Sequence, residues 1–313
     1  MIRIPPALAI SVISVSSVAS FSGSAEGVRA LVLGIAQDGG VPHIGCQQEL
    51  CMAARRDPTR RERVASLGLV DDRAGARFLI DATPDLPSQL ESLNAGRTLA
   101  DRRRPVEGIL LTHAHVGHYA GLVYLGREAL GAKGVPVYAT ARMARFLREN
   151  GPWSQLVSLG NIELREIEAG RELRLTPDLR VTPVAVPHRD EWSDTVGFVV
   201  RGPSGSLLYL PDIDKWEKWD RRIEDEVARV DLALLDATFH ALEEIPGRSQ
   251  TEVPHPLVGE TTGRLAALAR RVVFIHLNHT NRLLFDPGAR AELEAKGFRV
   301  ARDGESLPLE GPR

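Results

Sequence analysis

The chain has 313 residues, of which 43% are hydrophobic and 26% are charged. This length and apolar content are sufficient for a full hydrophobic core, and they exclude a disordered chain, a collagen-like repeat and a small disulfide-stapled fold. Because 39 Lys and Arg residues are balanced by 41 Asp and Glu residues, a broadly basic surface that binds nucleic acid is not expected. The composition therefore indicates a globular enzyme or a small-molecule binder.

Residues 1–25 have the layout of a secretory signal peptide. Arg3 precedes an apolar and serine-rich run over residues 7–18, and small residues follow as far as Ala25. The run is too short for a stable membrane span, and no other stretch approaches about 18 uninterrupted apolar residues. These features predict export to a periplasm or out of the cell, with a cytoplasmic location as the alternative if the leader is not a signal.

Beyond the leader, short β-branched runs alternate with segments of helical spacing. The expected strands are Arg29–Leu33, Ala65–Val70, Arg77–Asp81, Gly108–Thr112, Val135–Ala139, Arg180–Val186, Thr195–Val200, Ser206–Leu210, Leu232–Asp236 and Val272–Leu277. The expected helices are Leu86–Leu93, Tyr119–Ala129, Ala141–Glu149, Lys215–Ala228, Leu257–Arg270 and Pro287–Lys296. Helices that punctuate a strand-rich chain cover the outer faces of sheets, which predicts one α/β domain of αββα architecture over residues 28–309.

Three histidines follow the predicted strand Gly108–Thr112 in the stretch T-H-A-H-V-G-H over residues 112–118. Side chains two residues apart in an extended segment point the same way, so His113 and His115 can converge on one metal ion. His118 then opens a helix and can face the same cavity. Clustered imidazoles are typical of metal ligation, and the alternative is a set of hydrogen-bonded, inert loop histidines.

This stretch and four others resemble the metallo-β-lactamase superfamily, whose first metal motif is H-x-H-x-D-H after a buried strand. The other landmarks occur in the expected order, as F-L-I-D-A at 78–82, A-V-P-H at 185–188, L-Y-L-P-D at 208–212 and F-I-H-L at 274–277. The resemblance covers roughly residues 28–309. It implies a four-layer αββα sandwich of the metallo-β-lactamase type.

The resemblance also implies a set of metal ligands. They are His113, His115 and His188 for a first ion, His118 and His276 for a second ion, and Asp212 as a ligand of both. Of these, His118 and Asp212 are the expected catalytic residues. The expected cofactor is Zn²⁺, as one or two ions, with Fe or Mn as alternatives. Further residues expected to support the ligands or to face substrate are Asp81, Asp236, His240 and His279.

One position departs from the family pattern, because Gly117 stands where the motif has its aspartate. Losing an anionic oxygen ligand weakens a metal site, so a mononuclear site or a different metal such as iron stays open. Asp190, Asp214 and Asp236 lie near motif residues in the sequence and could supply the missing oxygen. Each could instead be a cap, a turn residue or a carboxylate that orients a ligand.

Two further stretches, residues 34–42 and 275–281, resemble the branch that holds coenzyme PQQ synthesis protein B and the cyclic phosphodiesterases of phosphonate breakdown. Members of that branch often carry a cysteine cluster that binds structural zinc. Here Cys46 and Cys51 are the only cysteines, with His43 and His255 as possible companions. A structural zinc, a disulfide and free thiols therefore all stay open.

The resemblance implies a metal-dependent hydrolase of an ester, phosphodiester or related bond in a small-molecule substrate, with metal-bound hydroxide as nucleophile. The narrower resemblance implies an alternative role in coenzyme PQQ synthesis, through metal-dependent oxidation or through handling or transport of PQQ or its precursor. A non-catalytic metal or ligand carrier on the same fold is the third hypothesis. The sequence does not indicate an oligomeric state.

Overall fold

A computed structural model of the chain describes residues 27–244 and 254–310. The predicted signal peptide, residues 1–25, lies outside the described residues, so export stays a prediction. Within the described part of the chain, every helix is too short or too polar to cross a bilayer.

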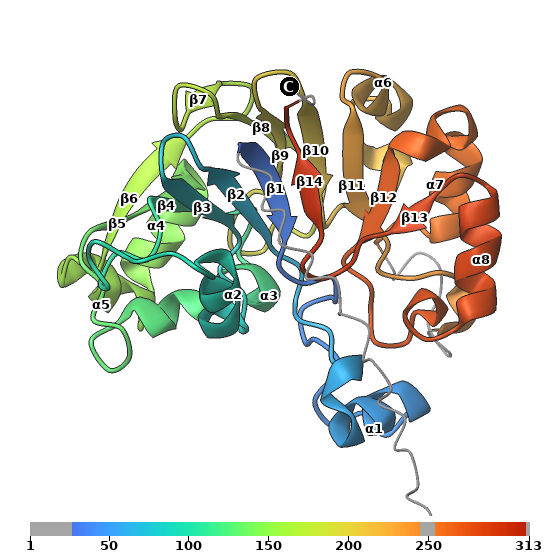
Figure 1. Cartoon of the computed structure of the whole chain (residues 1–313), viewed down its shortest axis with the longest axis horizontal. Coiled ribbons are helices and arrows are strands. Elements are labelled where there is room, and N and C mark those ends of the chain that lie inside the picture. Colours follow the sequence, from blue (N-terminus) through green and yellow to red (C-terminus); the bar gives the residue numbers. More distant parts are fainter. Residues whose placement is uncertain (1–26, 245–253, 311–313) are drawn as a thin grey trace, which may run out of the picture.

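Two seven-stranded mixed sheets form the centre of the molecule (Figure 1). The first has the order β14-β1-β2-β3-β4-β5-β6. Its strands β14, β1, β2 and β3 are antiparallel to their neighbours, whereas β3, β4, β5 and β6 run parallel. The strand bounds are β1 Val28–Val32, β2 Leu67–Asp71, β3 Ala76–Ile80, β4 Gly108–Leu110, β5 Val135–Thr140, β6 Ile162–Ile167 and β14 Ser306–Pro308.

The second sheet repeats this arrangement in the order β13-β12-β11-β10-β9-β8-β7. Strands β7 to β10 are antiparallel, and β10 to β13 run parallel. The bounds are β7 Leu173–Arg174, β8 Arg180–Ala185, β9 Val196–Arg201, β10 Ser206–Leu210, β11 Leu232–Asp236, β12 Val272–Ile275 and β13 Arg299–Val300. Each sheet therefore has one antiparallel half and one parallel half.

Helices cover the outer faces of both sheets (Figure 1). Those beside the first sheet are α2 Leu86–Leu93, α3 Val116–Tyr119, α4 Ala141–Glu149 and α5 Trp153–Ser158. Those beside the second are α6 Ile223–Ala228, α7 Val258–Arg264 and α8 Pro287–Ala295. Short 3-10 turns lie at Pro58–Arg60, Ala120–Leu125, Trp216–Lys218, Leu242–Glu244, Ala266–Arg271 and Arg282–Leu284. The predicted four-layer αββα sandwich is confirmed.

The layering follows from the alternation of side chains along each strand. In β3, Phe78 and Ile80 point between the sheets and share a core cluster with Phe198 and Tyr209. Leu79, between them in the sequence, points outward into a second cluster with the apolar side chains of α2 and α4. Because successive residues serve opposite faces, the buried strands are apolar throughout.

Some predicted elements differ from the structure. The predicted helix Lys215–Ala228 is a 3-10 turn at Trp216–Lys218 followed by α6. The indole of Trp219 donates a hydrogen bond to the carbonyl of Ala185 (2.9 Å), and this anchor fixes the chain in an extended conformation between the two helical segments. The predicted helix Tyr119–Ala129 is instead a 3-10 turn over Ala120–Leu125, directly after α3. Elements that were not predicted are α1, α5, β6, β7, β13 and β14.

Helix α1, Glu49–Arg56, lies in a small lobe that projects from one end of the sandwich (Figure 1). Two segments, residues 34–41 and 61–64, connect this lobe to the sheets, and we call them the neck. Within the neck, Val41 and Glu62 exchange backbone hydrogen bonds of 2.9 and 3.0 Å, and Ala36 bridges to both Val64 and Leu277. The neck is thus joined to the chain just after β12.

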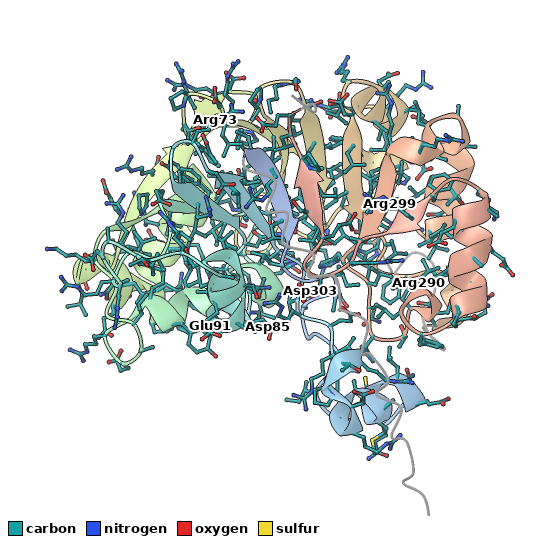
Figure 2. The ribbon with its side chains drawn as sticks, in the orientation of Figure 1. Arg73, Asp85, Glu91, Arg290, Arg299 and Asp303 are labelled. Atoms are coloured by element: carbon teal, nitrogen blue, oxygen red, sulfur yellow. The ribbon has the colours of Figure 1, made fainter. Side chains whose placement is uncertain are left out.

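The pKa of Glu62, a residue of the neck, depends on how the neck packs and can be tested. Burial and the nearby carboxylate of Asp303 raise the pKa of Glu62 to about 7, against the partial compensation of Arg290 and Arg63. Figure 2 labels Asp303 at this junction and Arg290 beside α8. Since an ionised Glu62 is disfavoured in the folded state, its cost is absent below the unfolded pKa near 4.5 and fully present above about pH 7.

We therefore predict that Glu62→Gln stabilises the protein at pH 8.5, by at most about 3 kcal/mol, and leaves stability at pH 4.5 nearly unchanged. Urea unfolding of both proteins at the two pH values measures the difference. Glu91→Gln, an exposed position on α2, is the control and should show no such pH-dependent gain. An equal effect of Glu62→Gln at both pH values would contradict the assigned burial.

Candidate metal centre

The carboxyl ends of parallel strands from both sheets meet at one edge of the sandwich, where α/β folds commonly bind ligands. Asp81 follows β3, and the histidine stretch that begins at His113 follows β4. In the second sheet, Asp212 follows β10, Asp236 ends β11 and His276 follows β12. Five landmarks far apart in the sequence are thereby brought to one place.

The backbone at this edge is held in an uncommon conformation at two points. Asp81 and His276 have φ values of 69° and 63°, and they are the residues other than glycine with left-handed φ in the described ranges. Each immediately follows a buried strand of a different sheet. Such conformations concentrate at functional sites because the surrounding structure must enforce them.

A first group of donors combines three imidazoles with one carboxylate. Donor atoms of His113, His115, His188 and Asp212 all lie within 4.8 Å of one another. The Nδ1 of His115 is 2.8 Å from His113 Nε2 and 3.2 Å from His188 Nε2. The Asp212 carboxylate lies 3.3 Å from both His113 Nε2 and His188 Nε2. Atoms that bind one ion at about 2.1 Å lie roughly 3 to 3.5 Å apart, so this spacing fits a shared metal ion.

A second group of donors lies beside the first. It consists of Asp38, His118 and His276, whose donor atoms also lie within 4.8 Å of one another. The Nε2 of His118 is 3.6 Å from Asp38 Oδ1 and 3.7 Å from Asp212 Oδ2. Asp212 therefore faces both groups, as the ligand shared by two ions was expected to do.

Hydrogen bonds on the outer side of each ring determine which nitrogen faces the centre. The hydroxyl of Thr112 donates to Asp81 and can therefore only accept from His113. In the same way, the hydroxyl of Thr238 donates to Asp236 and accepts from His276. Carboxylates accept from the other three rings. The pairs are His113 Nδ1 with Thr112, His115 Nε2 with Glu191, His118 Nδ1 with Asp81, His188 Nδ1 with Asp214, and His276 Nδ1 with Thr238.

In each of these five rings the outer hydrogen bond leaves the remaining nitrogen facing the centre. The Nε2 atoms of His118 and His276 are buried and have no hydrogen-bond partner within the described residues. Asp38 Oδ1 and Asp212 Oδ1 are also buried without a hydrogen-bond partner in that part of the chain. Buried polar atoms left unpaired are costly, and a cation at this point would satisfy all of them. The donor set thus fits a metal centre.

The charges of these groups are strongly coupled. Burial disfavours a protonated His118, but the carboxylate of Asp81 outweighs this effect, and the pKa of His118 is raised to about 9. Burial likewise opposes protonation of His188, yet Asp212 helps to raise the pKa of His188 to about 10. Burial favours the neutral acid of Asp212, but the surrounding imidazoles hold its pKa well below the usual range. Protons and a metal ion therefore compete for the same nitrogens.

His255 lies in this centre and not beside the cysteines. Its Nδ1 is 2.8 Å from Asp236 Oδ2 and 3.2 Å from Asp212 Oδ1. The donor atoms of His255, Asp236 and Asp212 also lie within 4.8 Å of one another, so this corner of the centre can hold a cation or a proton. The carboxylates of Asp236 and Asp212 raise the pKa of His255 against the opposing effect of burial. His255 is therefore placed to carry a proton next to the donor groups.

The other predicted residues lie outside the two donor groups. His279 stacks on His43 with ring centroids 4.2 Å apart, and His240 contacts Glu244 through its backbone amide. Cys46 and Cys51 are free thiols in the lobe, and the backbone amide of His43 donates to Cys51 Sγ (3.3 Å). The structure thus gives no disulfide between the two cysteines and places His255 away from them.

The three carboxylates considered as substitutes for the motif aspartate are engaged elsewhere. Their partners are the hydroxyl of Thr195 for Asp190, His188 for Asp214 and His255 for Asp236. Asp38, which sequence reasoning missed as a ligand, lies in the second donor group instead. Its only local signal is its place in the glycine-rich stretch 34–42.

Known proteins are similar to this chain over most of its length. A family model described as a beta-lactamase superfamily domain matches residues 76–277. Coenzyme PQQ synthesis protein B of Methylobacterium sp. (strain 4-46) is 30% identical over 314 residues, which cover 90% of this chain and 100% of the relative. The corresponding protein of Rhodopseudomonas palustris (strain TIE-1) is 28% identical with the same coverage.

Solved structures agree with these relatives. Zn²⁺-bound PqqB from Methylobacterium extorquens has a TM-score of 0.75 at 26% identity, covering 90% of this chain and 100% of that one. A diphosphatase of the PhnP family has a TM-score of 0.63 at 24% identity, covering 90% and 96%, and it supports the fold alone.

The chain belongs to the metallo-β-lactamase superfamily, as its ordered landmarks predicted. Within the superfamily it belongs to the branch of coenzyme PQQ synthesis protein B. Both levels of the resemblance seen in the sequence are confirmed.

Asp81 offers a test of the metal centre that leaves every ligand in place. Its carboxylate accepts from the amide and hydroxyl of Thr112 and from His118 Nδ1. We predict that Asp81→Asn weakens metal binding by about 10- to 100-fold, because His118 loses the acceptor that orients it. Asparagine tolerates the left-handed backbone at this position, so the fold should be retained.

Competition with a chromophoric chelator measures this affinity. Asp178→Asn, which removes an exposed carboxylate that pairs with Arg73, is the matched control and should bind metal like the wild type. Unchanged affinity in Asp81→Asn would argue against His118 as a ligand.

Proposed function

We propose that this chain is a metal-dependent hydrolase of an ester, phosphodiester or related bond. The observation that carries the proposal is the set of five imidazoles whose inner nitrogens face one centre, together with Asp212. A divalent ion held there polarises a phosphoryl or carbonyl oxygen and makes water nucleophilic near neutral pH. We propose Zn²⁺ as that ion, which a relative 26% identical to this chain binds.

The residues around the donors supply the remaining parts of a hydrolytic site. Asp212 is buried between the two donor groups and faces His113 and His118 from the first sheet. Asp236 orients His255 by accepting from Nδ1, so the proton available to a leaving group is the one on Nε2 of the protonated ring, which Asp236 and Asp212 favour. A protonated imidazole held against a carboxylate is suited to donate a proton to a departing alkoxide. We therefore assign His255 as the proton donor to the leaving group.

The first test is hydrolysis itself. Wild-type protein should hydrolyse bis(p-nitrophenyl) phosphate or a p-nitrophenyl carboxylic ester, lose the activity on chelation and regain it when Zn²⁺ is added. His113→Ala should abolish the activity, since it removes a donor of the first group. Glu163→Ala, an exposed position on β6, is the control. No hydrolysis of either ester class by metal-loaded wild type, or full activity of His113→Ala, would rule the proposal out.

The second test concerns His255 and the leaving group. We predict that His255→Gln lowers kcat/KM by about 10²- to 10⁴-fold for a dialkyl phosphodiester or alkyl ester, whose leaving group needs a proton. The loss should be less than about tenfold for a p-nitrophenyl leaving group, which departs as an anion. Equal losses for both leaving groups would show that His255 does not donate this proton.

A second candidate function is a role in coenzyme PQQ synthesis. The observation that favours it is the 30% identity to coenzyme PQQ synthesis protein B over the whole length of that relative. This role would be a metal-dependent oxidation or the handling of a precursor. Oxygen consumption by iron-loaded protein with a tyrosine-derived precursor would support it, whereas activity with Zn²⁺ alone would count against it.

A further inference from the structure

The second donor group contains a carboxylate that the superfamily motif does not place there. Gly117 stands at the motif's aspartate, and Asp38, from the neck, lies directly against it. We propose that Asp38 replaces the motif's aspartate as the carboxylate ligand of the second metal ion. The inference rests on the proposed metal-dependent function, and it makes the centre a site for two ions.

Steric evidence shows that Asp38 and a side chain at position 117 exclude one another. A Cβ atom at position 117 would overlap Asp38 Oδ1 and lie 2.7 Å from Asp38 Cα. Carbon atoms in proteins do not approach so closely, so any residue other than glycine displaces the neck. The position of Asp38 therefore requires glycine at position 117, and the Asp38 carboxylate occupies the space that a side chain there would take.

The surroundings of Asp38 indicate that its carboxylate lacks a binding partner. Its Oδ1 is buried without a hydrogen-bond partner in the described part of the chain, although a quarter of the whole side chain is exposed. Facing it are the unpaired Nε2 atoms of His118 and His276, both in side chains that are fully buried. Three unpaired donor atoms from three separate segments converge, and a cation is the group that satisfies all three.

Backbone hydrogen bonds hold Asp38 in register with His276. The amide of Leu277, the residue after His276, donates to the carbonyl of Ile35 (2.8 Å). The amide of Gln37, the residue before Asp38, donates to the carbonyl of Leu277 (2.9 Å). The two proposed ligands are thus fixed by one short ladder, which gives the neck segment the precision that a metal ligand requires.

Metal stoichiometry tests the proposal without reference to turnover. Apo protein is dialysed against Zn²⁺ alone, and bound metal is measured by elemental analysis at several free concentrations. Wild type should bind two equivalents at the centre, and Asp38→Ala should bind one. Asp190→Asn, which removes a carboxylate bonded to Thr195, is the matched control and should keep both. Reloading with Mn²⁺ adds a spectroscopic readout, because a spin-coupled pair should give way to an isolated ion in Asp38→Ala.

A second variant removes no ligand at all. Gly117→Ala should lose the second equivalent as Asp38→Ala does, because the added methyl group occupies the position of the carboxylate. Gly259→Ala is its control, since a Cβ there meets open space on α7. Circular dichroism and thermal unfolding of each variant establish that the fold is retained, and Asp38→Ala carries the test if Gly117→Ala does not fold.

The outcomes are distinct from those of the hydrolysis test. One equivalent in wild type, or two equivalents with unchanged affinity in Asp38→Ala, would overturn the proposal for Asp38. Loss of the second ion from Asp190→Asn but not from Asp38→Ala would overturn it as well. A protein that binds two ions through Asp38 yet hydrolyses no ester would refute the proposed function and leave this inference standing.

Discussion

One buried carboxylate, that of Asp212, determines how the two sheets meet at the functional edge. A buried negative charge must be compensated, and here the compensation comes from ring nitrogens of both halves of the sandwich. From the first sheet, His113 and His118 approach to 3.3 and 3.7 Å. From the second, His188 and His255 approach to 3.3 and 3.2 Å. The positions of all four rings are therefore tied to one group that follows β10.

In each sheet, a buried aspartate that accepts hydrogen bonds from a threonine also orients a histidine next to Asp212. In the first, Asp81 accepts from Thr112 and orients His118. In the second, Asp236 accepts from the amide and hydroxyl of Thr238 and orients His255. Both aspartates are fully buried at the ends of parallel strands, so both must be saturated with hydrogen bonds.

The two pairs of aspartate and histidine nevertheless differ in geometry. His118 uses Nδ1 for Asp81 and turns Nε2 toward the centre. His255 directs the same nitrogen, Nδ1, toward both Asp236 and Asp212. Repetition of one hydrogen-bonding pattern in two sheets thus places one ring with an unpaired buried Nε2 on one side and one ring between two carboxylates on the other.

The sequence sufficed for the fold and for the gathering of candidate ligands that follow strands. The landmarks at Asp81, His113, Asp212 and His276 are local patterns, each a buried strand with a polar residue directly after it, and strand pairing alone brings them together. The long helix predicted through Trp216 and beyond failed because helical spacing does not reveal tertiary anchors such as the Trp219 indole.

The two residues that sequence reasoning misplaced, Asp38 and His255, depend on contacts between distant segments. His255 was grouped with the cysteines because both are metal-binding residue types, and no local pattern indicated that it would lie against Asp236. Asp38 was quoted as part of a glycine-rich turn without a role as a ligand. The one useful signal was the glycine at the motif's aspartate, which left room for a carboxylate from elsewhere or for a site with a single ion.

The origin of that carboxylate affects which substrates the centre can accept. If Asp38 completes the second site, two divalent ions bound among the imidazoles would carry more positive charge than Asp212 and Asp38 together cancel. An anionic phosphodiester is therefore favoured over a neutral ester in the doubly loaded state. With one ion, the same two carboxylates cancel its charge, and this preference is lost. Because Asp38 reaches the centre from the neck, the proposed second site would link the packing of the neck against the sandwich to the charge that substrate meets.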